Sequence, residues 1–215
     1  MKAAIFDMDG TLLESMDMWK NLIPNYLAEI GIEVSDSFFS TTKYMDLKAS
    51  TNYIIDNFNL HDSPGNLYTL MKRKALKEYK KVRLKRYSKE YLSILKDQGI
   101  KLSLATQTPK DLVYEVLKEK SILQFFDSII TIEDVNNLDK SFPDIYLKAA
   151  ASFNLAINDC TIFEDSEIAI TTALNAGFSV IAIVNDNSLS KEITEYNAQL
   201  KLISNFKELI NVNGI

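Results

Sequence analysis

Two pairs of carboxylates stand immediately after short apolar runs of the chain. Asp7 and Asp9 follow Ala3–Phe6, and Glu164 and Asp165 follow another such run. Carboxylates that meet in one place repel one another, and some stay protonated unless a cation neutralises them. Oxygen ligands without histidine or cysteine favour a hard divalent cation, and Mg²⁺ often completes its shell with a substrate phosphate oxygen. The two pairs therefore predict a magnesium site that takes a phosphorylated ligand.

A carboxylate beside a phosphoryl group can also be a nucleophile. It can form an acyl phosphate that water later cleaves, and a second carboxylate two residues away is well placed to protonate the leaving group and then activate that water. Lys140 and Thr106 add a positive charge and a hydrogen-bond donor that suit a phosphoryl group. Gly10 allows a tight turn behind the first pair. In isolation, Asp7–Thr11 is more typical of a turn after a strand, so its interpretation as a catalytic motif depends on the other segments.

The elements that must hold these residues are apolar runs that alternate with amphipathic stretches. Apolar runs without strict alternation are typical of strands covered on both faces. Gly99 and Gly177 stand where a helix ends, and Pro109 and Pro143 where one begins. The expected strands are Ala3–Phe6, Leu102–Ala105, Ser128–Ile132, Thr161–Phe163 and Ser179–Val184, and the expected helices are Ser88–Gln98, Lys110–Glu119, Asp144–Asn154, Glu167–Asn175 and a tail near Asn205–Asn211. This alternation predicts an α/β fold with a doubly wound parallel sheet, whose ligands bind beyond the carboxyl ends of the strands.

The segment between the first strand and the rest of the sheet breaks this alternation. It contains no convincing strand and shows helical patterns at Met16–Ile30, Leu47–Phe58 and Asn66–Lys81. We expect residues 15–87 to form an all-helical insertion, and residues 1–14 and 88–215 to form the α/β core domain. The insertion carries methionine and aromatic side chains that are expected to form part of its core, among them Met16, Met18, Trp19, Tyr44 and Met45.

Four segments together resemble the motifs of the haloacid dehalogenase-like superfamily. Asp7-Met8-Asp9-Gly10-Thr11-Leu12 resembles the first motif, and Thr106 matches the second. Lys140-Ser141-Phe142-Pro143-Asp144 is similar to the third motif, and Phe163-Glu164-Asp165-Ser166 to the fourth. Order, spacing and strand context agree over nearly the whole chain. The helical insertion resembles the small cap of the subgroup that contains β-phosphoglucomutase and phosphoglycolate phosphatase-like enzymes, which implies a Rossmann-like core with a helical cap.

The resemblance implies a role for each matching residue. Asp7 would be the nucleophile and a ligand of Mg²⁺, and Asp9 would be the general acid and base, with its backbone carbonyl on the metal. Glu164 and Asp165 would hold the metal directly or through water. The catalytic set would be Asp7, Asp9, Thr106 and Lys140, and the phosphoryl group would be bound by Asp7, Met8, Asp9, Thr106, Gln107 and Lys140. The chain departs from the usual motifs at Gln107, Asp139, Ser141 and Ala169, none of which removes a catalytic group.

The activity implied by the resemblance is an Mg²⁺-dependent phosphatase that hydrolyses a small phosphorylated metabolite, a sugar phosphate or similar, through a phosphoaspartate. A phosphosugar mutase of the β-phosphoglucomutase type is the alternative, because it shares this core but excludes water from the phosphoaspartate. Trp19 stands where such mutases carry a cap histidine, and Thr11 where they tend to have valine. Residues 44–51 lack the arginine that would grip a second phosphate. These three features favour the phosphatase.

Composition excludes several other classes of protein. The 215 residues include 24 Lys+Arg and 29 Asp+Glu, and this acidic balance argues against a general nucleic-acid binder. The run Lys72–Lys89 nevertheless holds ten basic residues, so a non-catalytic binding module is a remote alternative to a solvated helix face. The lone cysteine, Cys160, is expected to be a small buried residue. Without a long apolar run or a signal peptide pattern, we expect a cytoplasmic protein with no membrane partner, as a monomer or weak dimer.

Overall fold

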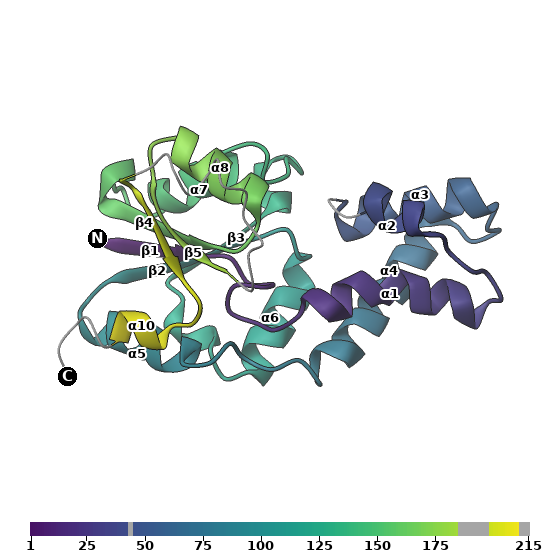
Figure 1. Ribbon diagram of the computed structural model, residues 1–215, viewed down its shortest axis with the longest axis horizontal. Coiled ribbons are helices and arrows are strands. Elements are labelled where there is room, and N and C mark those ends of the chain that lie inside the picture. Colours follow the sequence, from purple (N-terminus) through teal and green to yellow (C-terminus); the bar gives the residue numbers. More distant parts are fainter. Residues whose placement is uncertain (43–44, 185–197, 211–215) are drawn as a thin grey trace.

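The computed structural model describes residues 1–42, 45–184 and 198–210, and it contains a parallel sheet of six strands (Figure 1). The strand order is β3-β2-β1-β4-β5-β6, and every neighbouring pair is parallel. The strands are β1 (Ala3–Phe6), β2 (Lys101–Thr106), β3 (Ser128–Thr131), β4 (Cys160–Glu164), β5 (Ser179–Ile183) and β6 (Leu200–Ile203). The first strand lies between β2 and β4, and its register pairs Phe6 with both Leu104 and Phe163. The residues that follow these three strands therefore meet at one edge of the sheet.

Helices cover both faces of the sheet, which confirms the expected doubly wound α/β fold (Figure 1). The helices α7 (Asp144–Ala151) and α8 (Glu167–Asn175) lie on one face, and α5 (Ser88–Asp97), α6 (Lys110–Glu119) and α10 (Lys207–Ile210) lie on the other. All four residues of β1 are buried, and they alternate between two hydrophobic clusters: Ala3 and Ile5 belong to one, Ala4 and Phe6 to the other. A strand packed on both faces needs apolar residues at every position, which explains its uninterrupted apolar sequence.

Four helices lie between β1 and α5 in the sequence and stand to one side of the sheet (Figure 1). They are α1 (Met16–Glu29), α2 (Asp36–Thr42), α3 (Leu47–Phe58) and α4 (Pro64–Tyr79), and we call them the helical insertion. The helix α4 packs against both α1 and α3. Buried residues of the insertion, such as Leu27 and Met71, continue the hydrophobic cluster beneath the sheet. No helix in the described ranges is long and apolar enough to cross a membrane.

The two chain segments that join the insertion to the sheet run side by side. Leu13 forms an antiparallel bridge with Leu84. The backbone N–H of Glu14 donates to the carbonyl of Arg83 at 2.9 Å, and that of Lys85 donates to the carbonyl of Leu12 at 2.8 Å. The chain therefore enters and leaves the insertion at one hydrogen-bonded crossing, and α4 also packs against α6.

Several elements differ from the sequence-based expectations. The third strand ends at Thr131, because Ile132–Val135 forms a 3₁₀ turn that Asp134 and Thr131 cap. The helix α7 ends at Ala151 instead of Asn154. The elements α2 and β6 were not expected, because both are short: α2 consists largely of serine, threonine and phenylalanine, and β6 is an edge strand with an exposed lysine. Tyr44 and Asn211 lie outside the described residues.

Candidate active site

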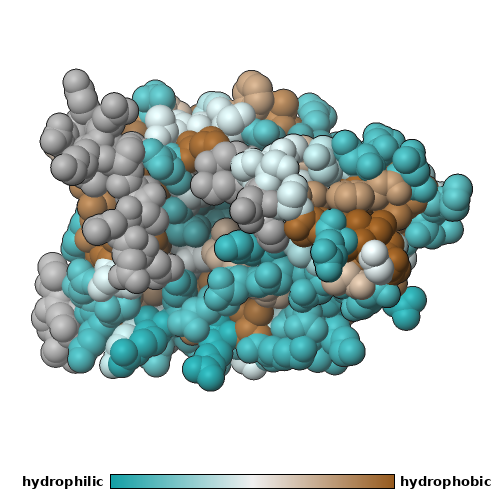
Figure 2. Space-filling model, turned by 45° about the vertical axis from the view of Figure 1, so that its right-hand side comes forward, coloured by the Kyte–Doolittle hydropathy of each residue, from teal (hydrophilic) through white to brown (hydrophobic). Residues whose placement is uncertain are grey.

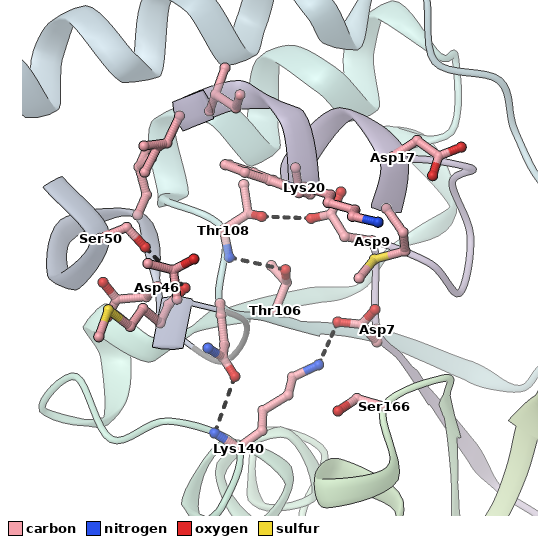
Figure 3. A pocket seen from close by; sticks show the side chains of 18 of the residues that line it. Asp7, Asp9, Asp17, Lys20, Asp46, Ser50, Thr106, Thr108, Lys140 and Ser166 are labelled. Carbon is pink, nitrogen blue, oxygen red and sulfur yellow. Dashed lines mark hydrogen bonds and ion pairs between the residues drawn. The ribbon is translucent and has the colours of Figure 1, made fainter. Parts of the chain in front are cut away.

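The residues that follow β1, β2 and β4 line one cavity of about 560 Å³ between the sheet and the helical insertion (Figure 3). Asp7 follows β1 directly, Thr106 ends β2, and Glu164 ends β4 with Asp165 next to it. Lys140 comes from the loop before α7 and extends its amine toward Asp7 (Figure 3). The strand order thus brings together side chains that are more than 150 residues apart in the sequence.

Lys140 is the cation in the middle of this cluster. Its side chain is buried, and its Nζ donates to Asp7 Oδ1 and Glu164 Oε1. Burial disfavours the ammonium, but these two carboxylates outweigh burial and raise the pKa of Lys140 above its ordinary value. Tyr146 of α7 donates its hydroxyl to the same Glu164 oxygen at 2.8 Å. Lys140 therefore stays charged and holds two carboxylates at a fixed separation.

One lysine does not balance the negative charge of this cluster. Burial raises the pKa of Asp7 well above its ordinary value, with further increases from Glu164 and Asp165, although Lys140 acts in the opposite direction. Burial and the charge of Glu164 raise the pKa of Asp165 to about 7. Carboxylate oxygens of Asp7, Glu164 and Asp165 lie within 4.8 Å of one another. A buried, oxygen-only group with excess negative charge is the donor set of a hard divalent cation.

Gly10 makes the close approach of Asp165 possible. A Cβ atom at Gly10 would lie 2.0 Å from Asp165 Oδ2, and the φ of Gly10 is +91°, a conformation that other residues rarely adopt. The next residue, Thr11, donates its hydroxyl to Asp165 Oδ1 at 3.2 Å. The glycine thus permits both the turn after β1 and the packing of a β4 carboxylate against that turn.

The carboxylate of Asp9 points away from the carboxylate group of Asp7, Glu164 and Asp165 and toward the helical insertion. It accepts hydrogen bonds from Ser15 Oγ at 2.6 Å, Thr108 Oγ1 at 2.6 Å and Tyr79 Oη at 2.7 Å. The indole N–H of Trp19 donates to the Tyr79 oxygen at 3.1 Å. Burial and the charge of Asp9 raise the pKa of Tyr79 well above its ordinary value, so this phenol remains a donor. Asp7 and Asp9 are two residues apart but occupy different electrostatic surroundings.

The remaining predicted residues lie around the same cavity. Thr106 Oγ1 accepts from the backbone N–H of Thr108 at 3.2 Å, and Gln107 Oε1 accepts from the backbone N–H of Lys140 at 3.3 Å. Met8 is fully buried and is not among the residues that line the cavity. Sequence reasoning missed Tyr79 and Tyr146, because nothing in the sequence near either tyrosine indicates its carboxylate partner.

Neither the basic residues of the run nor the cysteine is among the residues that line this cavity. Lys72 pairs with Asp111 of α6 at 2.6 Å and Lys74 with Glu29 of α1 at 2.5 Å, while Lys81 pairs with Glu78 inside the run at 2.8 Å. Such exposed pairs contribute little to stability, but they place acidic groups beside the basic run. Cys160 is buried at the start of β4, as expected.

Comparison with known proteins agrees with this geometry. Residues 4–183 match the haloacid dehalogenase-like hydrolase family. The chain belongs to this family. This membership confirms the resemblance seen in the four motifs, and it identifies the chain as an enzyme of the hydrolase class.

Relatives of this haloacid dehalogenase-like hydrolase include proteins named as phosphatases. The phosphorylated carbohydrates phosphatase of Thermotoga maritima is 27% identical over 195 residues, which cover 86% of this chain and 88% of that protein. Hexitol phosphatase B of Escherichia coli is 26% identical over 168 residues, which cover 76% of this chain and 75% of that protein. Among solved structures, CbbY from Rhodobacter sphaeroides in complex with phosphate has a TM-score of 0.79 at 19% identity, with 97% of this chain and 96% of that chain covered. This last similarity establishes the fold.

The contact between Gly10 and Asp165 predicts the effect of adding one methyl group. Both Gly10 and Gly31 have positive φ, but nothing lies within 4 Å of a Cβ at Gly31. We expect Gly31→Ala to cost about 1 kcal/mol of strain and Gly10→Ala to cost about 2 kcal/mol more, because Asp165 must move. A divalent cation should raise the melting temperature of the wild type and of Gly31→Ala but not of Gly10→Ala. If the cation shifts the melting temperature of both variants equally, the contact between Gly10 and Asp165 does not matter for cation binding, which would contradict this prediction.

The raised pKa of Asp165 predicts how stability depends on pH in metal-free protein. Between its ordinary value of 3.8 and its folded value of about 7, the folded state keeps a proton that the unfolded chain has lost. The free energy of unfolding should therefore fall as the pH rises from about 4 to about 7. Urea unfolding after removal of divalent cations measures this fall, which Asp165→Asn should reduce. Asp97→Asn, at an exposed position of α5, is the control and should leave the fall unchanged.

Proposed function

We propose that this enzyme is an Mg²⁺-dependent phosphatase that hydrolyses a small phosphorylated metabolite, a sugar phosphate or similar, through a phosphoaspartate at Asp7. The main support is the grouping of Asp7, Glu164 and Asp165 around the charged amine of Lys140 at the floor of the cavity. The names of the relatives, a phosphorylated carbohydrates phosphatase and a hexitol phosphatase, are consistent with this class of substrate.

The donor set fits Mg²⁺, because it consists of carboxylate oxygens and includes neither histidine nor cysteine. We propose that Asp7, Glu164, Asp165 and the backbone carbonyl of Asp9 hold the ion. When bound, it supplies positive charge to the phosphoryl oxygens and offsets the repulsion among the carboxylates. The raised pKa values of Asp7 and Asp165 describe the protein without this charge.

The reaction would proceed in two displacements at phosphorus. In the first, a carboxylate oxygen of Asp7 attacks the phosphorus, the bond from phosphorus to the alcohol oxygen breaks, and Asp9 gives its proton to the departing oxygen. In the second, Asp9 takes a proton from water, the water oxygen attacks the phosphorus, and the acyl phosphate bond breaks to release phosphate and restore Asp7. Lys140, Thr106, Gln107 and the backbone of Met8 would bind the phosphoryl oxygens in both steps.

We also propose that residues 15–87 act as a cap over the core formed by residues 1–14 and 88–215. The hydrogen-bonded crossing at Leu13 and Leu84 supports this division, because few interactions there would have to change if the insertion moved. The hydrogen bond from Tyr79 in α4 to Asp9 supports it further, because the position of the insertion then determines the orientation of the proposed acid and base.

The phosphosugar mutase remains the alternative reaction. Two observations argue against it. Trp19 lines the cavity where such mutases carry a cap histidine, and Thr11, where they tend to have valine, donates its hydroxyl to Asp165. Conversion of β-glucose 1-phosphate to glucose 6-phosphate without phosphate release, in the presence of a bisphosphate activator, would identify the mutase. The non-catalytic binding module has less support, because lysines of the run Lys72–Lys89 already pair with carboxylates. Binding of nucleic acid that weakens as the salt concentration rises would support the non-catalytic binding module.

Phosphate release from a panel of sugar phosphates, nucleotides and phosphoglycolate tests the proposed reaction. We expect Mg²⁺-dependent release that EDTA abolishes and that Asp7→Asn reduces at least about 1,000-fold, because the nucleophile is lost. Asp97→Asn removes an exposed carboxylate of α5 and should retain wild-type activity. Absence of release from every compound, together with absence of phosphorylation of Asp7 by an acyl phosphate donor, would refute the proposal.

The hydrogen bond between Tyr79 and Asp9 predicts a second effect on activity. We expect Tyr79→Phe to lower kcat about tenfold, because Asp9 loses one of the three hydroxyl groups that orient it. Tyr91→Phe is the matched control, since Tyr91 is a buried tyrosine that packs against Phe163 and Phe206 in the core. Steady-state kinetics on the best substrate would measure both variants, and equal kcat values would argue against a role for Tyr79.

A further inference from the structure

The cavity has two chemically different sides. The floor carries the carboxylates and Lys140, whereas the opposite wall comes from the helical insertion and is mostly apolar. On the face seen in Figure 2, hydrophobic residues gather over the insertion, while much of the remaining surface is hydrophilic. The apolar side chains of the wall include Trp19, Leu22 and Ile23 of α1, Phe38 of α2, and Met45 and Leu47 next to or in α3. A phosphate seated on the floor therefore directs the rest of its ester toward an apolar surface.

Several polar groups of this wall already form hydrogen bonds within the insertion itself. The bonds are Trp19 Nε1 to Tyr79 Oη at 3.1 Å, Thr42 Oγ1 to the Phe38 carbonyl at 2.9 Å, Ala49 N–H to Asp46 Oδ1 at 2.7 Å, and Ser50 Oγ to the Met45 carbonyl at 3.5 Å. A ligand hydroxyl that is buried against such a wall loses its water and gains few partners, which costs about 1–3 kcal/mol. The wall thus disfavours a leaving group that is polar on every side.

The charges around the cavity disfavour a second phosphate. Besides the carboxylates of the floor, Asp17 and Asp46 line the cavity, and Figure 3 places both away from Lys140. The described lining residues include two cations, Lys140 and Lys20, and the first is engaged with Asp7 and Glu164. A doubly phosphorylated ligand would place its distal group near carboxylates, with Lys20 as the cation on the wall.

We infer that the preferred substrate is a monophosphate ester whose alcohol carries an aromatic or other flat apolar group. This inference rests on the proposed phosphatase function. The volume of about 560 Å³ leaves room for such a group beyond the phosphate, since ligand pockets of drug-sized molecules start at about 300 Å³. The rings of Trp19 and Phe38 can contact a flat group by offset or edge-to-face packing, and the Met45 thioether can contact its edge.

Two matched pairs of esters test this inference. Uridine 5′-monophosphate carries a base where ribose 5-phosphate carries a hydroxyl, and benzyl phosphate carries a ring where glycerol 1-phosphate carries a dihydroxyethyl group. The phosphate is on a primary alcohol in all four. We expect kcat/KM to be at least about tenfold higher for the aromatic member of each pair. Equal or higher kcat/KM for the non-aromatic members would overturn the inference and leave the proposed phosphatase function standing.

A pair of methionine variants assigns the preference to the wall. Met45→Gln keeps the size of the side chain and makes it polar, so the aromatic preference should fall about threefold. Met18→Gln makes the same change in α1 at a methionine that packs against the hydrophobic cluster of the insertion, and it should leave the preference unchanged. An equal loss in both variants would indicate a general effect on the insertion and would count against the proposed wall.

A binding measurement separates failure of this inference from failure of the proposed reaction. Trp19 is the single tryptophan of the chain and lines the cavity, so its fluorescence reports on ligands at the wall. With Asp7→Asn and Mg²⁺, we expect benzyl phosphate to change this fluorescence at concentrations about tenfold lower than glycerol 1-phosphate. If benzyl phosphate binds more tightly in this way but the wild type hydrolyses neither ester, the result would support the aromatic preference of the apolar wall and refute the proposed phosphatase reaction. Equal affinities would refute the wall whatever the activity.

Discussion

The ion pairs of Lys140 with Asp7 and Glu164 are the interaction on which the site depends. The strand order places β1 beside β4, so the carboxylates after these strands must meet whatever their charge. Burial of like charges at this edge would oppose the fold, and the buried ammonium of Lys140 offsets part of that cost. The remaining excess appears as the raised pKa values of Asp7 and Asp165. A site that is incompletely neutralised by its own side chains is suited to bind a cation and an anionic ester together.

The same constraint explains why the two aspartates of the first motif differ. Asp7 shares its surroundings with other carboxylates and a lysine, whereas Asp9 is surrounded by the hydroxyl groups of Ser15, Thr108 and Tyr79. Hydroxyl donors fix the orientation of a carboxylate without adding a charge that would pull it into the ion cluster. This difference in surroundings is consistent with the proposed roles, in which Asp9 transfers protons and Asp7 forms the bond to phosphorus, although a single residue separates them.

The sequence predicted those parts of the site that follow from strand ends, and it could not predict those that depend on helix packing. Asp7, Thr106 and Glu164 were predictable because each stands where an apolar run stops, and parallel strands bring such positions to one edge. Tyr79 and Tyr146 were not, because each lies on a helix where an aromatic residue is equally typical of the core, and only the packed structure reveals its carboxylate partner. The helix α2 was missed because its residues are poor helix formers and its fold depends on burial of Phe38.

The apolar wall and the orientation of Asp9 depend on the same helices. Trp19 of α1 presents its ring to the cavity and donates its indole N–H to Tyr79, which in turn donates to Asp9. Contact of a ligand with that ring would therefore favour the position of α1 and α4 in which Asp9 is held. Binding energy from a group remote from the phosphorus would then be used to orient the proton donor, which raises kcat as well as affinity. Because most of the wall is apolar, a ligand that packs against the ring would stabilise that position better than a ligand that is polar on every side.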